Sequence, residues 1–578
     1  MKRIVCSILS TLTLFIALSC NKSDDKTSVI ASLGVSVKGT EDVIEIPKRQ
    51  SKSFEVNLTS DPGPEEALIV TLGANAELVA KYNAAHGTDY QLLPAEAYDL
   101  PATPFLLPRY NKVSSLESIT LKGAGCIPGE IYLLPLVANK VEGMAAYETP
   151  EDKAAYILFK MLLPDQEGEG TQDDPYILNN VNAFMKISAM LREGETVYFK
   201  LAGDIDLTGI EWESINGEGK KAALDGDGHT IRNLTAPLFA KLEGSVQNLT
   251  IDGATISATT ADCGVLAGAA GIAEQPNSLV AKNVTVKNAS IENTNNRVGG
   301  LIGYLYGGVI ENVDVECTVS GGQQVGGFIG RMDAGTLINC SAEANVTASN
   351  YYAGGLVAYI GTATVKGCHS SGKCSNASTG YSRVGGLIGQ MHGGSVENSY
   401  STVAVDGLGH FGGGLIGVVD TQESVAISKS YATGSVTLPQ TNNKAGAGAL
   451  LGYIEKGTVS IENCYATGAI QARRWSSGFV GRNNTGILTI VNGYTTSDVS
   501  AIALPGASGI VLGNNGGAVS CSGFIAWNVS NWAFCYPADA VPTTGNYYGT
   551  EGTVSSQAVT LGWSTDIWDL SGDEPKLK

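Results

Sequence analysis

This chain of 578 residues has few charged side chains, only five histidines and no Cys-x-x-Cys pair. The missing cysteine pairs argue against a zinc site, and the formal net charge of −19 argues against nucleic acid as a partner. The sequence also lacks a Gly-x-Ser-x-Gly elbow, a Cys with an obvious His partner and a Lys-Ser/Thr pair after its glycine-rich stretches. We therefore predict no catalytic residue, no metal and no cofactor.

Long apolar runs are also absent beyond the first twenty residues. Lys2 and Arg3 precede an apolar stretch over 4–18, which is typical of a signal peptide ending at residue 20. The run Ala17-Leu18-Ser19-Cys20 is similar to a bacterial lipobox, so we expect Cys20 to be diacylated after cleavage. The membrane contact of the mature protein would then be this N-terminal lipid.

A polar tether is expected at 21–30. Its run Ser23-Asp24-Asp25 resembles the signal that sends Bacteroidetes lipoproteins to the cell surface. We therefore expect an outer membrane lipoprotein displayed on the cell surface, although a plain polar tether explains the same residues.

Nine cysteines remain after Cys6 is removed with the signal and Cys20 is lipidated, an odd number without regular close spacing. This count does not imply a disulfide framework. Cys340, Cys368 and Cys464 share one repeat position with serines, which indicates small side chains packed in a core.

A short glycine-flanked motif recurs through much of the chain at spacings of about 27 to 36 residues, the period of a repeat array. The clearest copies are Val298-Gly299-Gly300-Leu301-Ile302-Gly303, Val325-Gly326-Gly327-Phe328-Ile329-Gly330, Ala353-Gly354-Gly355-Leu356-Val357-Ala358, Val384-Gly385-Gly386-Leu387-Ile388-Gly389 and Gly412-Gly413-Gly414-Leu415-Ile416-Gly417. Two bulky apolar residues between glycines are too few for a helix and suit a short buried strand. The following runs, such as 309–319 and 396–405, alternate apolar and polar residues as half-buried strands do. Each repeat therefore predicts one coil of a parallel β-helix, whose stacked coils bury a common core.

Three consecutive positions at one bend also repeat. The first is an asparagine, for which we expect left-handed backbone angles and a side chain in an inward ladder: Asn312, Asn339, Asn398, Asn463 and Asn492. The second is small and expected to point inward. The third is a tyrosine in four successive coils: Tyr400, Tyr431, Tyr465 and Tyr494. Strict alternation places these four outside, as an aromatic stripe that could bind a glycan, whereas a bulge at the bend would stack them inside.

The repeats resemble those of the GLUG-motif proteins, and the resemblance covers roughly 170–578. It includes the opening runs 170–177, 199–207 and 224–231 and the closing Trp568-Asp569-Leu570. The resemblance implies a right-handed parallel β-helix over 171–578 on a secreted or surface protein, without implying one activity.

A separate domain is expected at 31–163, followed by an acidic, glycine-rich linker at 164–170. Spaced strand-like runs predict a β-sandwich with one short helix at 76–85 that ends at Gly87. The segment 78–98 resembles the N-terminal domain of unknown function found before Bacteroidetes endoglycosidases, which implies an immunoglobulin-like spacer. The predicted fold class is therefore all-β, an immunoglobulin-like sandwich followed by the β-helix.

Glycan cleavage on a β-helix requires carboxylates that converge across neighbouring coils. Asp314 and Glu316 share a strand face, but we expect no column of paired carboxylates, because Ser341 and Glu343 occupy the next coil. The run 225–229 lacks the acids of a calcium loop.

We therefore predict a non-catalytic cell-surface lipoprotein that binds a glycan or another host or cell-surface ligand. A polysaccharide lyase or hydrolase on the same β-helix and a purely structural stalk are the alternatives.

Overall fold

The computed structural model describes residues 32–40, 42–47, 51–127, 130–142, 154–162, 167–259, 261–273, 275, 278–438, 446–499, 501–502, 509–527 and 545–578. The expected signal peptide, Cys20 and the tether lie outside the described residues. The chain divides into two compact units, Met1–Asp165 and Gln166–Lys578, and this division falls inside the expected linker. Within the described part, no helix has the length and apolar character needed to cross a membrane.

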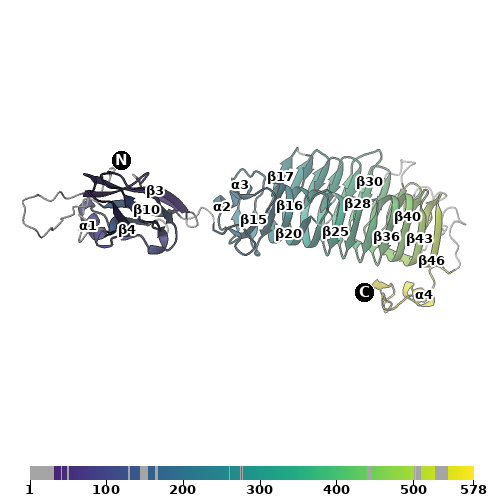
Figure 1. Cartoon of the computed structure of the whole chain (residues 1–578). Coiled ribbons are helices and arrows are strands. Elements are labelled where there is room, and N and C mark those ends of the chain that lie inside the picture. Colours follow the sequence, from purple (N-terminus) through teal and green to yellow (C-terminus); the bar gives the residue numbers. More distant parts are fainter. Residues whose placement is uncertain are drawn as a thin grey trace, which may run out of the picture. The chain divides into compact units, whose positions relative to one another are not determined.

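The first unit is a sandwich of two β-sheets (Figure 1). One sheet runs in the order β1 (Ser32–Val37), β3 (Ser51–Asp61), β8 (Glu117–Lys122) and β6 (Tyr98–Asp99). The other runs β2 (Ile44–Pro47), β10 (Ala155–Leu162), β9 (Ile131–Glu142), β4 (Leu68–Ala74) and β7 (Phe105–Leu107), with β5 (Gln91–Leu92) beside β9.

The core of the sandwich forms where alternate side chains of both sheets meet, for example Val56 and Ile119 from one sheet and Val70 and Ile157 from the other, all fully buried. The helix α1 (Glu77–His86) packs through Leu78, Val79 and Tyr82, and a short 3₁₀ helix follows at Ala95–Ala97. Gly87 ends α1 with a left-handed φ of 65°, which confirms the predicted C-terminal cap.

The second unit is a parallel β-helix (Figure 1). It opens with β11 (Tyr176–Leu178), α2 (Val181–Met185), α3 (Ile187–Met190), β12 (Thr196–Leu201), β13 (Ile205–Asp206), β14 (Ile215–Asp225), β15 (Thr230–Arg232), β16 (Phe239–Asp252) and β17 (Thr255–Ala258). In seven of the later coils a short strand opens the glycine motif; each later coil has a strand that begins at the end of the motif and one to three strands on the remaining side.

The strands before the motif form a seven-stranded parallel sheet: β18 (Asp262–Cys263), β21 (Arg297–Gly299), β24 (Gln324–Gly326), β27 (Tyr352–Gly354), β30 (Arg383–Gly385), β35 (Phe411–Gly413) and β39 (Gly446–Gly448). The strands that begin after the motif are β19 (Ala267–Ala270), β22 (Ile302–Leu305), β25 (Ile329–Ile338), β28 (Val357–Lys366), β31 (Ile388–Met391), β36 (Ile416–Ser428), β40 (Leu451–Ala466), β42 (Val480–Asn483) and β45 (Leu512–Asn515). The remaining side contains β20 (Leu279–Asn293), β23 (Val309–Gly321), β26 (Ser341–Ala348), β29 (His369–Asn376), β32 (Gly394–Glu397), β33 (Tyr400–Ser401), β34 (Ala404–Gly407), β37 (Tyr431–Ala432), β38 (Val436–Thr437), β41 (Ile470–Ala472), β43 (Ile487–Thr495), β44 (Ala501–Ile502) and β46 (Ala518–Trp527).

The interior of the β-helix is filled by both apolar residues of each motif. Leu387 and Ile388 are each fully buried, as are Leu301 and Ile302, and the pattern holds through the stack. Along β23 buried and exposed side chains alternate, which confirms the predicted half-buried strand. Cys340, Cys368 and Cys464 are buried free thiols, so the predicted small core position is also confirmed.

The asparagines at the bend adopt the predicted left-handed angles, with φ of 49° to 55° for Asn312, Asn339, Asn398, Asn463 and Asn492. The prediction that they point inward is wrong, because the first three are exposed. Their amides form a ladder on the outside of the coils: Asn339 donates to Asn312 at 3.3 Å, and Asn312 donates to Asn283 at 3.2 Å.

The C-terminal segment, residues 545–578, contains β47 (Tyr547–Gly549), α4 (Val554–Thr560), β48 (Trp568–Asp569) and β49 (Lys576–Leu577). It packs on the outside of the last coils through a small apolar cluster that includes Tyr494, Ile525, Trp563 and Trp568. A capping box at Thr553 and Ser556 begins α4.

Candidate functional site

The four predicted tyrosines are in register across neighbouring strands. Tyr400 pairs with Tyr431, Tyr431 with Tyr465, and Tyr465 with Tyr494. Their rings stack face to face at centroid distances of 4.6 to 4.9 Å with interplanar angles of 7° or less, and His369 continues the stack at 4.8 Å from Tyr400. None of them belongs to the interior core of the β-helix, so the column lies on its outer side.

The C-terminal segment covers one end of this column. Tyr494 is only 2% exposed, and its hydroxyl donates to the Pro575 carbonyl at 3.0 Å. Trp563 and Trp568 lie beside it. Burial raises the pKa of both Tyr465 and Tyr494 well above the ordinary value. Of the four predicted binding residues, Tyr494 is therefore not available to a ligand.

The stacking also changes what the remaining column can offer. A sugar ring packs on the face of an aromatic ring, but each tyrosine face here is turned toward the next ring. Tyr400 and Tyr431 are partly exposed, and since both of their ring faces are stacked, the exposed parts of these rings are edges. The column therefore exposes ring edges and no free ring faces at Tyr400 and Tyr431, and glycan binding there stays a prediction.

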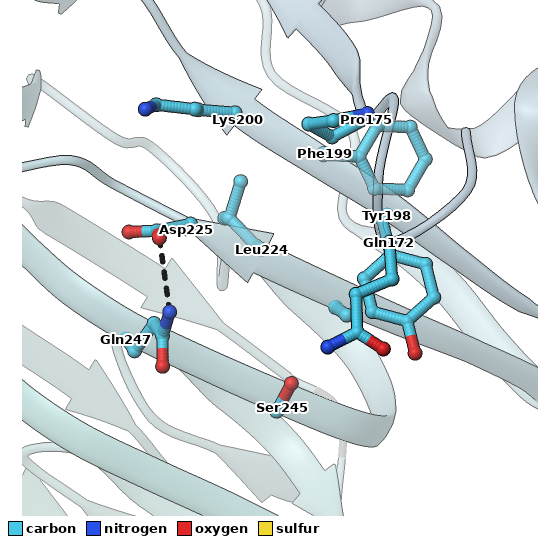
Figure 2. A pocket seen from close by; sticks show the side chains of 10 residues that line it. Gln172, Pro175, Tyr198, Phe199, Lys200, Leu224, Asp225, Ser245 and Gln247 are labelled. Carbon is cyan, nitrogen blue, oxygen red and sulfur yellow. Dashed lines mark hydrogen bonds between the residues drawn. The ribbon is translucent and has the colours of Figure 1, made fainter. Parts of the chain in front are cut away.

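A hollow of about 490 Å³ lies near the start of the β-helix (Figure 2). Tyr198 and Lys200 line it together with Asp225, which accepts a hydrogen bond from Gln247 at 2.9 Å. Burial opposes ionisation of Asp225, but bonds from the Asp227 amide, Gln247 and Asn248 outweigh it and lower its pKa. This carboxylate is thus already satisfied by donors. In the described ranges no group of three or more His, Cys, Asp or Glu is placed to hold a metal ion.

One pair of carboxylates contradicts the prediction that no column holds two acids. Glu316 on β23 is in register with Glu343 on β26. Both side chains are exposed, and they therefore lack the burial that tunes a carboxyl group into a general acid. The repeat spacing places Glu316 and Glu343 one coil apart, so this match is visible in the sequence.

A second candidate surface lies beside the glycine motif, where the strands on either side of it approach closely. A Cβ on Gly299 would lie 2.1 Å from the Ile302 carbonyl oxygen, and one on Gly303 would lie 2.8 Å from that of Arg297. Only glycine allows the strands β21 and β22 to approach so closely. The residues flanking the motif, Arg297 and Tyr304, are thereby brought together outside the core, with the guanidinium 4.3 Å from the ring centroid.

The same juxtaposition continues along the stack of coils. We call the following set the arginine–aromatic ladder: Arg297, Tyr304, Arg331, Tyr352, Tyr359, Tyr381, Arg383, Phe411, Tyr453, Arg474, Trp475 and Arg482. Guanidinium groups lie 4.0 to 5.3 Å from ring centroids throughout it. Phe411 stacks on Tyr453 with ring centroids 4.1 Å apart. This contact joins the part of the ladder up to Arg383 to the part that contains Arg474, Trp475 and Arg482.

Charges and sheltered polar atoms also gather on the ladder. The hydroxyl of Tyr304 donates to Asp333, which also accepts from Arg331 Nε at 2.7 Å. Burial, reinforced by this carboxylate, raises the pKa of Tyr304 to about 12. Among the described residues, Gln390 Oε1, Arg474 Nε and Arg482 Nε are sheltered atoms without a hydrogen-bond partner. Such atoms are rare in proteins.

The sequence did contain a signal for the ladder. Arg297, Tyr352, Arg383 and Phe411 each stand one residue before a motif, and Tyr304, Arg331, Tyr359, Tyr453 and Arg482 each stand one residue after one. The repeat pattern is dominated by the two apolar residues of the motif, which predict the core. The arginine and aromatic residues beside the motif differ from coil to coil and so do not stand out as a repeat.

This combination of fold and surface defines a solenoid repeat protein with a preceding β-sandwich. A family profile for the GLUG motif matches residues 294–320, 321–347 and 380–406, and a profile described as an N-terminal domain matches residues 19–144. The chain thus contains GLUG motifs and an N-terminal domain of this described kind.

Halomucin of Haloquadratum walsbyi is 30% identical over 163 residues, which cover 24% of this chain and 2% of halomucin. This chain therefore spans a very small part of that relative. A Bacteroides ovatus structure assigned provisionally as an immunoglobulin A1 protease has a TM-score of 0.30 at 20% identity, covering 71% of this chain and 94% of its own. A second B. ovatus structure, assigned provisionally as a carbohydrate-binding protein, has a TM-score of 0.20 at 18% identity, covering 24% and 40%.

Proposed function

We propose that this protein is a non-catalytic, glycan-binding protein of the cell surface, and that the arginine–aromatic ladder is its binding face. The ladder carries the proposal because it repeats aromatic rings and hydrogen-bond donors along one side of the β-helix. Its rungs extend over six coil steps from Arg297 to Trp475. At about 4.8 Å for each step, the face is about 29 Å long, which suits a chain of sugars.

Rings that a glycan can reach are present on and beside the ladder. Tyr381 is 42% exposed and Tyr351, which stacks against Tyr352, is 46% exposed. Their rings offer apolar contact, and arginine side chains nearby offer several N–H donors that match hydroxyl groups. Tyr381 lies 4.7 Å from the Arg383 guanidinium and donates to Glu455 at 3.3 Å, so its ring is held in place before a ligand arrives.

The test is a glycan array with the mature protein, followed by affinity measurements on each ligand found. Tyr381→Ala removes a side chain that is 42% exposed and lies outside the core, so we expect a folded protein with about tenfold weaker binding or more. Tyr431→Ala is the matched control on the tyrosine column and should bind normally. A loss confined to Tyr431→Ala would move the site to that column, and an array without any ligand would overturn the proposal in favour of a structural stalk.

A further inference from the structure

The last rungs of the ladder differ in charge from the earlier ones. Arg297 donates to Asp262 at 3.2 Å, Arg331 donates to Asp333, and Arg383 lies 3.8 Å from Glu455. Each of these arginines therefore has a carboxylate partner. Arg474 and Arg482 have none within the described part of the chain.

These two arginines are held close together by one tryptophan. The Arg474 guanidinium lies 4.0 Å and the Arg482 guanidinium 4.3 Å from the centroid of the Trp475 ring, so the two cations are within about 8 Å of each other. Arg482 is further oriented by donating to Asn484 at 3.1 Å and by lying 5.3 Å from the Tyr453 ring.

The backbone at this point is also unusual. Trp475 has a φ of 52°, a left-handed conformation that is rare for a bulky side chain. Such conformations persist only where the surroundings enforce them, and they gather at sites that grip ligands. The Trp475 ring is therefore fixed between its neighbours before any ligand binds.

Two unpaired cations at this separation repel each other, and an anion placed near both would relieve that repulsion. Their presence on a chain with a formal net charge of −19 makes this end of the ladder a local cationic site on an acidic protein. Guanidinium groups present a planar fork of donors that fits the paired oxygens of a carboxylate or sulfate.

We propose that the Arg474–Trp475–Arg482 end of the ladder binds the anionic group, carboxylate or sulfate, of an acidic glycan. This inference rests on the proposed function and adds the chemical class of the ligand. The residues of the ladder from Arg297 to Tyr453 contact the uncharged sugars of the glycan. The Arg474–Trp475–Arg482 end binds the charged group and so selects an acidic glycan.

The experiment measures binding of the folded, mature protein to three soluble polysaccharides: polygalacturonate, dextran sulfate and uncharged dextran. We compare the wild type with a double variant, Arg474→Gln and Arg482→Gln, by calorimetry at low and high salt. The control is Arg109→Gln, because Arg109 also lies over an aromatic ring, at 4.5 Å from Tyr110, but in the other unit.

We expect the wild type to prefer at least one charged polymer to dextran, with affinity falling as salt rises. The double variant should lose about tenfold or more of that affinity, and the Arg109→Gln control should lose none. The arm that loses affinity, polygalacturonate or dextran sulfate, identifies carboxylate or sulfate as the group bound.

Two results would overturn the inference: a wild type that binds neither charged polymer more tightly than dextran, or a double variant that remains folded by circular dichroism and binds both as well as the wild type. If the double variant does not fold, the single Arg474→Gln variant decides in its place, since Arg474 makes no side-chain hydrogen bond among the described residues. The proposed function is judged separately, by the array and by Tyr381→Ala.

Discussion

Trp568 donates its indole N–H to the side-chain oxygen of Asn463 at 3.2 Å, across 105 residues of sequence. Both partners are buried, so this bond ties the C-terminal segment to one bend of the β-helix. Trp568→Phe keeps an aromatic ring but leaves the Asn463 acceptor buried without its donor. We expect about 1–3 kcal/mol lower free energy of unfolding, measured by urea denaturation. Tyr351→Phe, at an exposed ring, is the control and should change nothing; equal stabilities for all three proteins would contradict the contact.

The glycine at the corner of a middle coil cannot be replaced without displacing the backbone. A Cβ on Gly386 would lie 2.0 Å from the Gly414 carbonyl oxygen, whereas the nearest atom to one on Gly380 would be 3.7 Å away. We therefore expect Gly386→Ala to cost about 1–3 kcal/mol or more, and Gly386→Val to cost more still. Gly380→Ala should be nearly neutral. Thermal unfolding of the variants checks this, and similar melting temperatures for both alanine variants would be evidence against close packing at the corner.

The core side chain of the same motif provides a test of burial. Ile388 is fully buried, so Ile388→Ala should lower the free energy of unfolding by about 2–5 kcal/mol. Ile487 is 55% exposed, and Ile487→Ala should cost much less. Chemical denaturation of the two variants in parallel gives the comparison, and a cost at Ile487 as large as that at Ile388 would be inconsistent with the stacked core.

Tyr304 predicts a dependence of stability on alkaline pH. Its folded pKa is raised from 10.0 to about 12, by burial first and by Asp333 second. A raised pKa means that the folded state holds the proton more tightly, so this stabilisation is present below pH 10 and is lost as pH rises to about 12. Wild-type stability should therefore fall more steeply than that of Tyr304→Phe over this range. Denaturant midpoints at several pH values measure the difference, and parallel curves would show that Tyr304 does not contribute.

The lipoprotein hypothesis places the membrane anchor at Cys20, which lies outside the described residues. Cys20→Ala should prevent lipidation and abolish partition of the protein into a detergent phase. Extraction of cells that express each form measures this, with Cys126→Ala as a control at another cysteine. Unchanged partition of the Cys20 variant would contradict the lipoprotein hypothesis.

The architecture was predictable because its determinants are local and repeated. A pair of apolar residues such as Leu387 and Ile388 recurs from coil to coil, so the burial of the pair follows from the motif. The register of Tyr400 with Tyr431 follows from the repeat spacing. The predicted inward direction of the Asn312 side chain was wrong, because a residue with left-handed backbone angles turns the chain and breaks the alternation of inward and outward side chains. The burial of Tyr494 could not be predicted, since the segment that covers it is distant in sequence.

The ladder was missed for a related reason. Arg297 and Tyr304 are seven positions apart, and they meet only because Gly299 and Gly303 let two strands approach at the corner. A pattern search that assigns side chains to faces strand by strand does not bring such residues together.

The glycine corner also separates two demands that usually compete. The buried pair of each motif maintains the coil, while the residue that precedes the motif lies outside the core and differs from coil to coil: Arg297, Gln324, Tyr352, Arg383 and Phe411 occupy equivalent positions in successive coils. Duplicating a coil would therefore lengthen the ladder by one coil, and a different residue at the flank of that coil would change the chemistry of the ladder there while the buried pair still fills the core. The protein thus has a modular surface that can diversify one coil at a time.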